Sequence, residues 1–237
     1  LPEAHQSPIK LALRDFQLSG VALEGEAKTR YAEISARLSQ LSSDFSNHVL
    51  DATQAYFKPL NEEQLKGLPQ SSIDLLKQYG QQRELEQAVA TLDIPSYLAI
   101  MTYADDRGLR EELYKAYTTR ASDLSEHPEF DNTQVMEEIL SLRHEMAQLL
   151  GFNNYAELSL ASKMAPDVET VDKFLVDLAE HARAPATQEI AELKAIASQD
   201  GIHDLQPWDT GYYSEKLKVD QFNLSQESLK PYFPAPK

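Results

Sequence analysis

The chain has 237 residues, of which 42% are hydrophobic, and it can bury a substantial core as one large helical domain or two small ones. Its 22 Lys and Arg against 38 Asp and Glu give a formal net charge of −16, which repels phosphate backbones and anionic lipid, so we expect neither nucleic acid nor a membrane as a partner. Without cysteine it forms no disulfide and no thiolate, which fits the reducing cytoplasm.

The sequence lacks the features of a complete precursor. It begins with Leu1 instead of an initiator Met and has no signal-peptide pattern. No apolar run approaches the ~20 residues of a membrane span. We therefore expect a segment of a longer polypeptide, produced by processing or by trimming.

Three helices are predicted in the first third of the chain, at 9–18, 26–56 and 71–85. The second is long and amphipathic, roughly 45 Å at about 1.5 Å per residue. Its apolar stripe consists of Tyr31, Ile34, Leu38, Leu41, Phe45, Val49, Ala52 and Tyr56. His48 lies beside this stripe, where a hydrogen-bonded packing role is commoner than a ligand role. Gly80 weakens the third helix.

A small β-ribbon is predicted from short apolar runs around Phe57 and at 88–93, although such short runs are also compatible with helix. Two further helices are predicted at 96–103 and at 109–122. Pro95 suits the first turn of the earlier one, because its ring fixes a helical backbone angle.

The stretch 130–164 contains the clearest helix of the chain. Its apolar residues recur in steps of four and three, which places them on one face. They are Val135, Ile139, Leu142, Met146 and Leu149. Asp131 or Asn132 can cap the start of this helix, and Gly151 stands where a left-handed residue is wanted at its end.

The carboxyl-terminal third is predicted to hold a short helix at 154–161 and a long helical pattern from 168 to about 198. Pro185 interrupts the long pattern, which predicts either a kinked helix or two helices. Its two apolar faces are Val171, Phe174, Leu175, Leu178 and then Ile190, Leu193, Ile196, Ala197. The tail beyond Gly201 is rich in aromatic residues.

No catalytic or metal-binding residue is assigned. His144 and Glu145 begin a near-match to the zinc-protease signature, which needs a second histidine four residues after the first so that both imidazoles face one metal. That position holds Gln148, whose amide is a poor zinc ligand. The other histidines are scattered, and the adjacent glutamate pairs splay apart on their helices, so neither set suits acid–base chemistry.

Tyr212 and Tyr213, in the aromatic tail, are the candidates for lining a substrate channel. A tyrosine offers a large apolar face with a polar tip, which suits a binding groove. A core-closing aromatic cluster is an equally good explanation for both residues, and a better one for Trp208.

Several short motifs share an order and a spacing that span nearly the whole chain. They are IPSYL at 94–98, MTY at 101–103, LREELY at 109–114, AY at 116–117, TRAS at 119–122, LRHE at 142–145, LLGF at 149–152, NYA at 154–156, KM at 163–164, PWD at 207–209, YY at 212–213 and LKPYFP at 229–234. Together they resemble the thimet oligopeptidase family of zinc metallopeptidases.

The resemblance implies a mainly α fold, with long amphipathic helices and one small β-ribbon, that forms the non-catalytic half of a two-sided peptidase channel. It also implies a full-length metallo-oligopeptidase that cleaves short peptides, with zinc held by an HExxH helix and a further glutamate in the carboxyl-terminal half. None of those ligands maps onto this sequence.

Residues 1–237 are therefore expected to be one amino-terminal-side, channel-wall segment, with no internal boundary assigned. Alone it is predicted to bind no zinc and to hydrolyse no peptide. Its expected partners are short peptides and the catalytic half of the same polypeptide. The alternative is a free-standing helical module that binds a peptide or a protein without catalytic activity.

Overall fold

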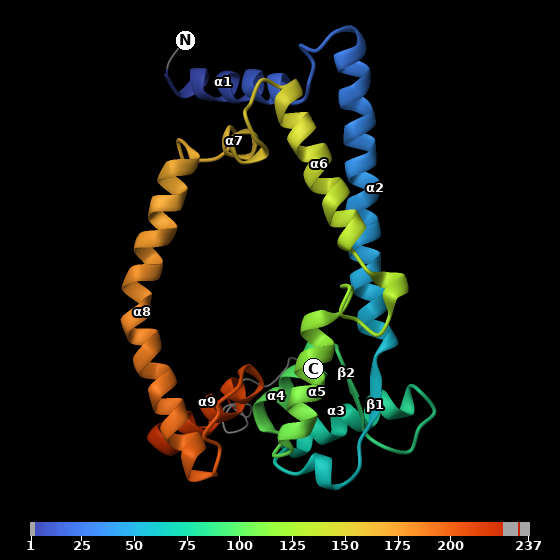
Figure 1. The fold of residues 1–237 in the computed structure, drawn as a ribbon, viewed down its shortest axis with the longest axis vertical. Coiled ribbons are helices and arrows are strands. Elements are labelled where there is room, and N and C mark those ends of the chain that lie inside the picture. The colour runs from blue at the N-terminus through green and yellow to red at the C-terminus, as the bar shows by residue number, and fades with distance from the viewer. Residues whose placement is uncertain (1–2, 225–231, 233–237) are drawn as a thin grey trace. The chain divides into compact units, whose positions relative to one another are not determined.

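The computed structural model describes residues 3–224 and 232, with the backbone alone for 3–7. The chain is mainly α, as predicted, and its described residues include one two-stranded sheet (Figure 1). Two compact units are present. Unit 1 takes the described residues up to His48 and 132–183, and unit 2 takes 49–131 and the described residues from Ala184 on. The predicted motif at 229–234 lies, apart from Tyr232, outside the described residues.

Unit 1 is entirely helical in its described residues. Its elements are α1 (Glu3–Leu18), most of α2 (Gly25–Ala55), α6 (Thr133–Leu149), α7 (Tyr155–Leu160) and the first half of α8 (Val168–Gln199). The helices α2 and α6 lie side by side and join their predicted apolar stripes (Figure 1). Ile34, Leu41 and Leu142 are buried at this interface. Two bidentate ion pairs flank it, Arg30–Glu145 and Arg37–Glu138.

His48 has the packing role that was expected, because its Nδ1 lies 2.9 Å from Oδ1 of Asn132. The Asn132 amide also donates to the Phe45 carbonyl at 3.2 Å. Of the two predicted caps, Asn132 occupies the N-cap position of α6, but its side chain makes no capping hydrogen bond and instead ties the start of α6 to α2. Gly151 follows α6 with a φ of +84°, the left-handed conformation that was predicted.

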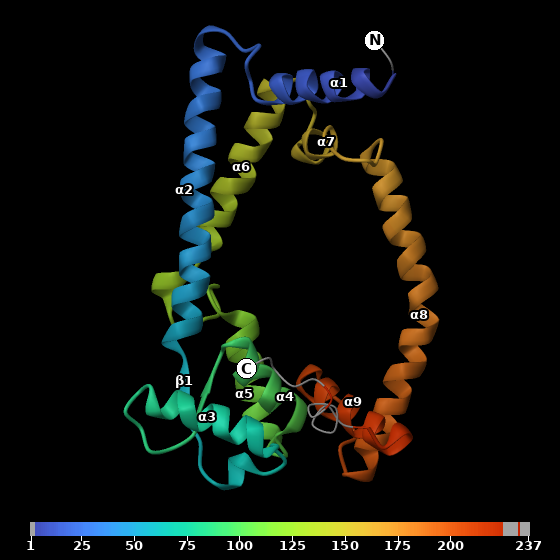
Figure 2. The ribbon, with the colours of Figure 1, turned by 180° about the vertical axis from the view of Figure 1, so that it is seen from behind.

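Unit 2 contains the predicted β-ribbon and a group of short helices. Its elements are β1 (Phe57–Pro59), the 3₁₀ turn Glu63–Leu65, α3 (Gln70–Gln81), β2 (Val89–Thr91), α4 (Ile94–Tyr103), α5 (Arg107–Thr119), the 3₁₀ turn Pro128–Phe130, the end of α8, and α9 (Pro207–Phe222). The strands pair antiparallel, with Phe57 opposite Thr91, so the ribbon is confirmed (Figure 2). No helix in the described part of the chain is long and apolar enough to cross a membrane.

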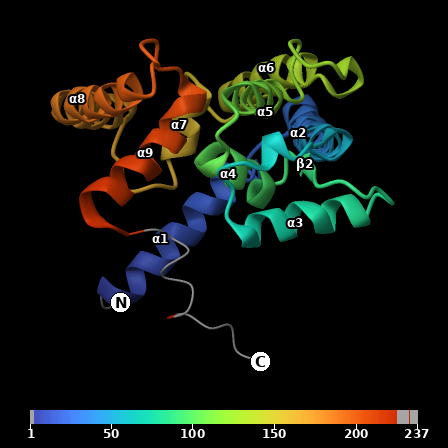
Figure 3. The ribbon, with the colours of Figure 1, turned by 90° about the horizontal axis from the view of Figure 1, so that it is seen from below.

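The core of unit 2 has two clusters. In the first cluster, α3, α4 and α5 pack against the β-ribbon. Leu76, Ile100 and Leu113 are fully buried there. The second cluster joins the end of α8 to α9, and α9 lies beside α4 (Figure 3). The last helix among the described residues, α9, thus packs on a core that begins about a hundred residues earlier.

Several predicted boundaries are wrong. α1 begins at Glu3 instead of residue 9 and contains Pro8. α3 ends at Gln81 instead of 85, and α5 spans 107–119 instead of 109–122, because the Asp106 side chain accepts from the Leu109 N–H and starts the helix early. α8 is one helix with Pro185 inside it, so the two-helix alternative is wrong.

We predict that Gly80→Ala lowers the free energy of unfolding by about 1–3 kcal/mol, although helix propensity alone would favour alanine by about 1 kcal/mol. A Cβ atom at Gly80 would lie 2.0 Å from the Gln87 carbonyl oxygen, so either α3 or the following turn must shift. Urea unfolding followed by circular dichroism measures the change.

The matched control is Gly108→Ala in α5. A Cβ there meets only the Asp106 Oδ1 atom, at 3.3 Å, so the loss of stability should be much smaller than at Gly80. Equal effects of the two substitutions would mean that the Gly80–Gln87 approach does not restrict residue 80.

Candidate functional site

The candidate tyrosines lie on α9, a helix that the sequence analysis did not predict. Pro207 occupies its first turn, and a capping box closes its start, with the Asp209 carboxylate accepting from the Gln206 N–H at 3.0 Å. A Cβ atom at Gly211 would lie 3.3 Å from the Met101 carbonyl oxygen. The backbones of α9 and α4 therefore approach closely, which fixes the position of the tyrosines.

A buried ion-pair network joins α9 to α5. Asp209 is fully buried and Arg110 is 1% exposed. Arg110 Nη2 donates to Asp209 Oδ1 at 2.9 Å, and Arg107 Nη2 donates to Oδ2 at 2.8 Å. Burial alone would raise the pKa of Asp209, but hydrogen bonds from Arg107, from the Gln206 backbone and from Arg110 outweigh it, so this pKa lies below its ordinary value. Asp209 is thus an anion that holds two guanidinium groups.

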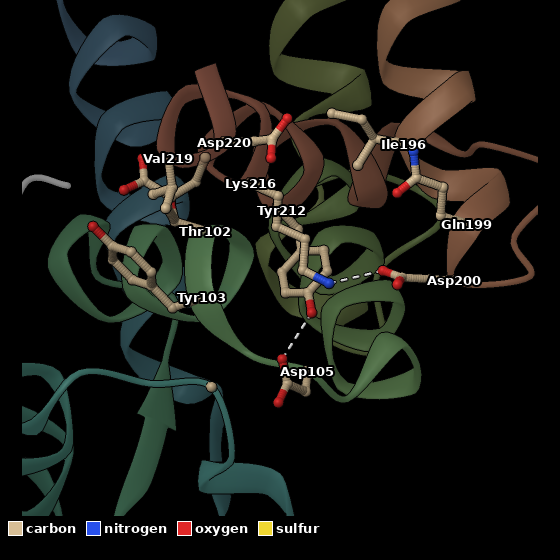
Figure 4. Close-up of a pocket in the computed structure, with 12 residues that line it drawn as sticks. Thr102, Tyr103, Asp105, Ile196, Gln199, Asp200, Tyr212, Lys216, Val219 and Asp220 are labelled. Atoms are coloured by element: carbon tan, nitrogen blue, oxygen red, sulfur yellow. Dashed lines mark hydrogen bonds and ion pairs between the residues drawn. The ribbon is translucent and has the colours of Figure 1, made fainter. Parts of the chain in front are cut away.

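Tyr212 lines a cavity of about 490 Å³ within unit 2 (Figure 4). Its hydroxyl donates to Asp105 Oδ1 at 2.7 Å. The Arg110 guanidinium lies 4.1 Å from its ring centroid and Lys216 Nζ lies 4.7 Å from it. Lys216 in turn pairs with Asp200 at 2.7 Å, as Figure 4 shows. Burial and the bond to Asp105 raise the pKa of Tyr212, so its hydroxyl stays protonated at neutral pH and donates a hydrogen bond.

Tyr213 points into the core of unit 2. It is 2% exposed, packs with Leu193 and Ala197, and meets the edge of the Tyr212 ring with centroids 5.2 Å apart. Burial raises the pKa of its hydroxyl. Tyr213 therefore closes the core, whereas Tyr212 both packs and faces a cavity.

His144 and Glu145 contact other side chains of unit 1. Glu145 pairs with Arg30, and Gln148 Nε2 lies 3.0 Å from His144 Nε2. Among the side chains that the structure describes, at 8–224 and 232, no three His, Asp or Glu residues converge as a metal site. The polar groups of the Tyr212 cavity can bind and orient a ligand by charge and hydrogen bonding.

Sequence reasoning missed most of the cavity. Asp105, Asp200 and Lys216 received no role, because Asp105 meets Tyr212 across a separation of 107 residues and no local pattern encodes such a pairing. A local signal for α9 was present. Pro207 at a first turn, with Asp209 two residues later, is typical of a helix start.

The chain is similar to known peptidases along its whole length. The sequence model described as peptidase family M3 matches residues 100–237. Oligopeptidase A of Escherichia coli (strain K12) is 50% identical over 240 residues, which cover 100% of this chain and 35% of that protein. Oligopeptidase A of Haemophilus influenzae is 49% identical over 234 residues, covering 98% and 34%. The probable cytosolic oligopeptidase A of Arabidopsis thaliana is 40% identical over 248 residues, covering 100% and 35%. The chain thus spans about a third of the length of these relatives.

Proposed function

Because the chain belongs to peptidase family M3, we propose that it is the amino-terminal-side, channel-wall segment of a zinc metallo-oligopeptidase that hydrolyses short peptides. One observation carries the proposal: the similarity to oligopeptidase A covers 100% of this chain and only 35% of the relative. Family M3 is zinc-dependent in general. In this proposal the remaining polypeptide holds the metal, and the segment restricts the channel but neither binds zinc nor cleaves peptide alone.

The exposed apolar face of α8 supports the proposal that another part of the polypeptide packs against this helix. Phe174, Leu175 and Leu178 are 63%, 54% and 55% exposed, although they form the first apolar face predicted for this helix. Every residue from 172 to 191 is exposed. A helix with an uncovered apolar stripe gains little from packing, and most helical stability in proteins comes from such packing. We propose that the catalytic half of the same polypeptide covers this face.

The proposed substrates are short peptides, and the proposed location is the cytoplasm. A net charge of −16 suits neutral or basic peptides better than acidic ones. The absence of cysteine suits a reducing compartment.

The size of the native polypeptide tests the proposal directly. An antibody raised against this segment is used to probe a lysate of the source cells. A band far above 26.7 kDa is expected. A band at 26.7 kDa would instead favour the free-standing helical binding module.

Zinc content and turnover of the pure segment form a second test. We expect neither stoichiometric zinc by elemental analysis nor cleavage of a short quenched peptide. Either finding would contradict a purely channel-shaping role.

We predict that Tyr212→Phe in the complete peptidase changes the selectivity between short peptides by about two- to tenfold, because it removes only the hydroxyl bonded to Asp105. Competition between pairs of quenched peptides measures the ratio of kcat/KM values. Tyr56→Phe is the control, since it removes a hydroxyl that donates to Glu112 at 3.1 Å outside this cavity, and it should leave the selectivity unchanged. An unchanged selectivity profile in Tyr212→Phe would contradict the hypothesis that Tyr212 lines the substrate channel.

A further inference from the structure

A groove on unit 1 gathers apolar side chains that the rest of the described chain leaves exposed. It lies between α2 and α6, which Figure 1 shows side by side, and has a volume of about 520 Å³. Phe45, Met136 and Leu140 line it and are 36%, 42% and 67% exposed. The α2–α6 pair thus buries one row of apolar residues between its helices and leaves a second row open to a further packing element.

The walls of the groove favour a helix as its occupant. The lining residues at 38–46 and 136–143 lie inside α2 and α6, so their backbone groups are already paired within those helices. An extended segment would gain no backbone partner there, and its own N–H and C=O groups would lose their bonds to water. A helix pairs its own backbone. The stretch 38–46 is about 12 Å long at about 1.5 Å per residue, which matches roughly two turns of an occupant.

Three serines on α2 allow such a helix to approach closely. Ser39, Ser42 and Ser46 line the groove in steps of three and four. The Ser46 hydroxyl donates to the Ser42 carbonyl at 2.9 Å, so its hydrogen bond stays within its own helix. A row of small side chains beside larger apolar ones forms a groove into which the ridge of a neighbouring helix fits.

Arg143 supplies the charge of the groove. Among the described residues that line it, Arg143 alone is charged at neutral pH. Its guanidinium lies 4.9 Å from the centroid of the Tyr155 ring, and it makes no ion pair with any described residue. Arg30 and Arg37 of the same unit, in contrast, each bind a glutamate of α6. A guanidinium beside an apolar surface suits a carboxylate, so we expect the occupant to present an Asp or a Glu.

We propose that this groove holds an amphipathic helix from the part of the polypeptide that lies outside these 237 residues. The apolar face of that helix packs on Phe45, Met136 and Leu140, and one of its carboxylates binds Arg143. The inference rests on the proposed function in one respect, because it requires a longer polypeptide; the similarity to oligopeptidase A covers 35% of that protein. It adds a further contact, since none of the described residues that line the groove belongs to α8.

A second copy of the chain fits this groove less well. In a two-fold dimer the same patch meets itself. The described lining contains Arg143 and no carboxylate, so such a dimer would bring two guanidinium groups to an apolar interface without a partner for either. A helix on the same polypeptide supplies the carboxylate and reaches the groove at a high effective concentration.

Thiol alkylation tests the inference, because the chain has no cysteine of its own. Leu140→Cys is placed in the complete peptidase and in the 237-residue chain, and mass spectrometry of the peptide that contains position 140 follows its reaction with N-ethylmaleimide. We expect the thiol to react at least about tenfold more slowly in the complete peptidase, because the docked helix must open first. Ser141→Cys, an exposed position on the same helix outside the groove, should react equally fast in both forms.

Two results would overturn the proposal. Equal rates for Leu140→Cys in the two forms would mean that nothing covers the groove. Protection that appears in the 237-residue chain alone and rises with its concentration would assign the groove to a second copy.

Reversal of the charge at Arg143 tests the carboxylate. The protection factor of Leu140→Cys is its rate in the 237-residue chain divided by its rate in the complete peptidase, and this ratio cancels any direct effect of a neighbouring charge on the thiol. Arg143→Glu should lower the factor by about five- to tenfold, whereas Arg143→Lys should keep most of it. Circular dichroism confirms that both variants unfold cooperatively. An unchanged factor in Arg143→Glu would reject an acidic helix as the occupant.

A third thiol position separates this inference from the proposed function. Phe174→Cys lies on the face of α8 that the catalytic half is proposed to cover. Protection of Phe174→Cys without protection of Leu140→Cys would leave the channel-wall proposal in place and reject the helix in the groove. Protection of Leu140→Cys without protection of Phe174→Cys would support the helix in the groove and contradict the covering of α8.

Discussion

Replacement of Asp209 by alanine is expected to lower the free energy of unfolding of the chain by about 3–5 kcal/mol. The substitution leaves Arg110, which is 1% exposed, as an unpaired buried cation. It also removes the carboxylate that accepts from the Gln206 N–H at the start of α9. Both losses fall on the helix that completes the core of unit 2, so urea unfolding at neutral pH should show a large decrease in midpoint.

A double variant separates ionic pairing from packing. Asp209→Leu combined with Arg110→Met removes both charges and keeps similar volumes, and it should lose less stability than Asp209→Ala. A loss as large as that of Asp209→Ala would contradict the idea that the unpaired guanidinium is the main cost.

The same carboxylate makes stability depend on pH with a known sign. The pKa of Asp209 in the folded chain lies below its ordinary value of 3.8. Its contribution to stability is therefore fully present above pH 3.8 and disappears as the pH falls through the lowered folded-state pKa. The unfolding free energies of the unmodified chain and Asp209→Ala should converge in acid, and a constant difference would contradict this assignment.

The second large effect is expected when charged residues replace apolar ones on the exposed face of α8. Combining Phe174→Asp with Leu178→Asp should leave the stability of the 237-residue chain within about 0.5 kcal/mol, because both side chains are exposed. In the complete peptidase of the proposed function, the same pair should cost about 1.5–3 kcal/mol for each side chain that the catalytic half covers, with loss of peptidase activity. Thermal unfolding and peptide turnover of both forms measure the two effects.

Glu180→Ala on the opposite side of α8 is the matched control, and it should affect neither form. Identical behaviour of the doubly charged variant in the segment and in the complete peptidase would mean that the catalytic half does not cover this face.

Local sequence patterns predicted two kinds of element. These are strands that pair with a strand nearby in the sequence, and helices with a long apolar stripe. The apolar stripes of α2 and α6 follow from periodic apolar residues, although their pairing was not predicted, and Gly151 follows from the need for a left-handed residue after α6. The β-ribbon follows from two short apolar runs, and the structure pairs them with Phe57 opposite Thr91. In each case the residue types themselves restrict the backbone or the buried face.

The missed features depend on side chains that meet across long separations. Asn132 looks like a helix cap in the sequence, but its amide bonds Phe45 and His48 instead. Gly80 looks like a weak helix residue, but its use is the close approach of the Gln87 carbonyl. Asp105 and Tyr212 have no pattern that connects them before the fold is known.

The two units are interleaved along the chain, since unit 2 begins before residue 132 and finishes only after Ala184. During synthesis, Met101 in α4 therefore cannot pack against Gly211, its neighbour in the folded chain, until α9 has been made. At ribosomal speeds of about 5–20 residues per second, this delay lasts roughly 5–20 seconds. During that interval the surface of α4 that α9 later covers stays exposed to solvent on the nascent chain. A chain that ended at the unit boundary after Arg183 would leave that surface exposed permanently, because α9 would be missing.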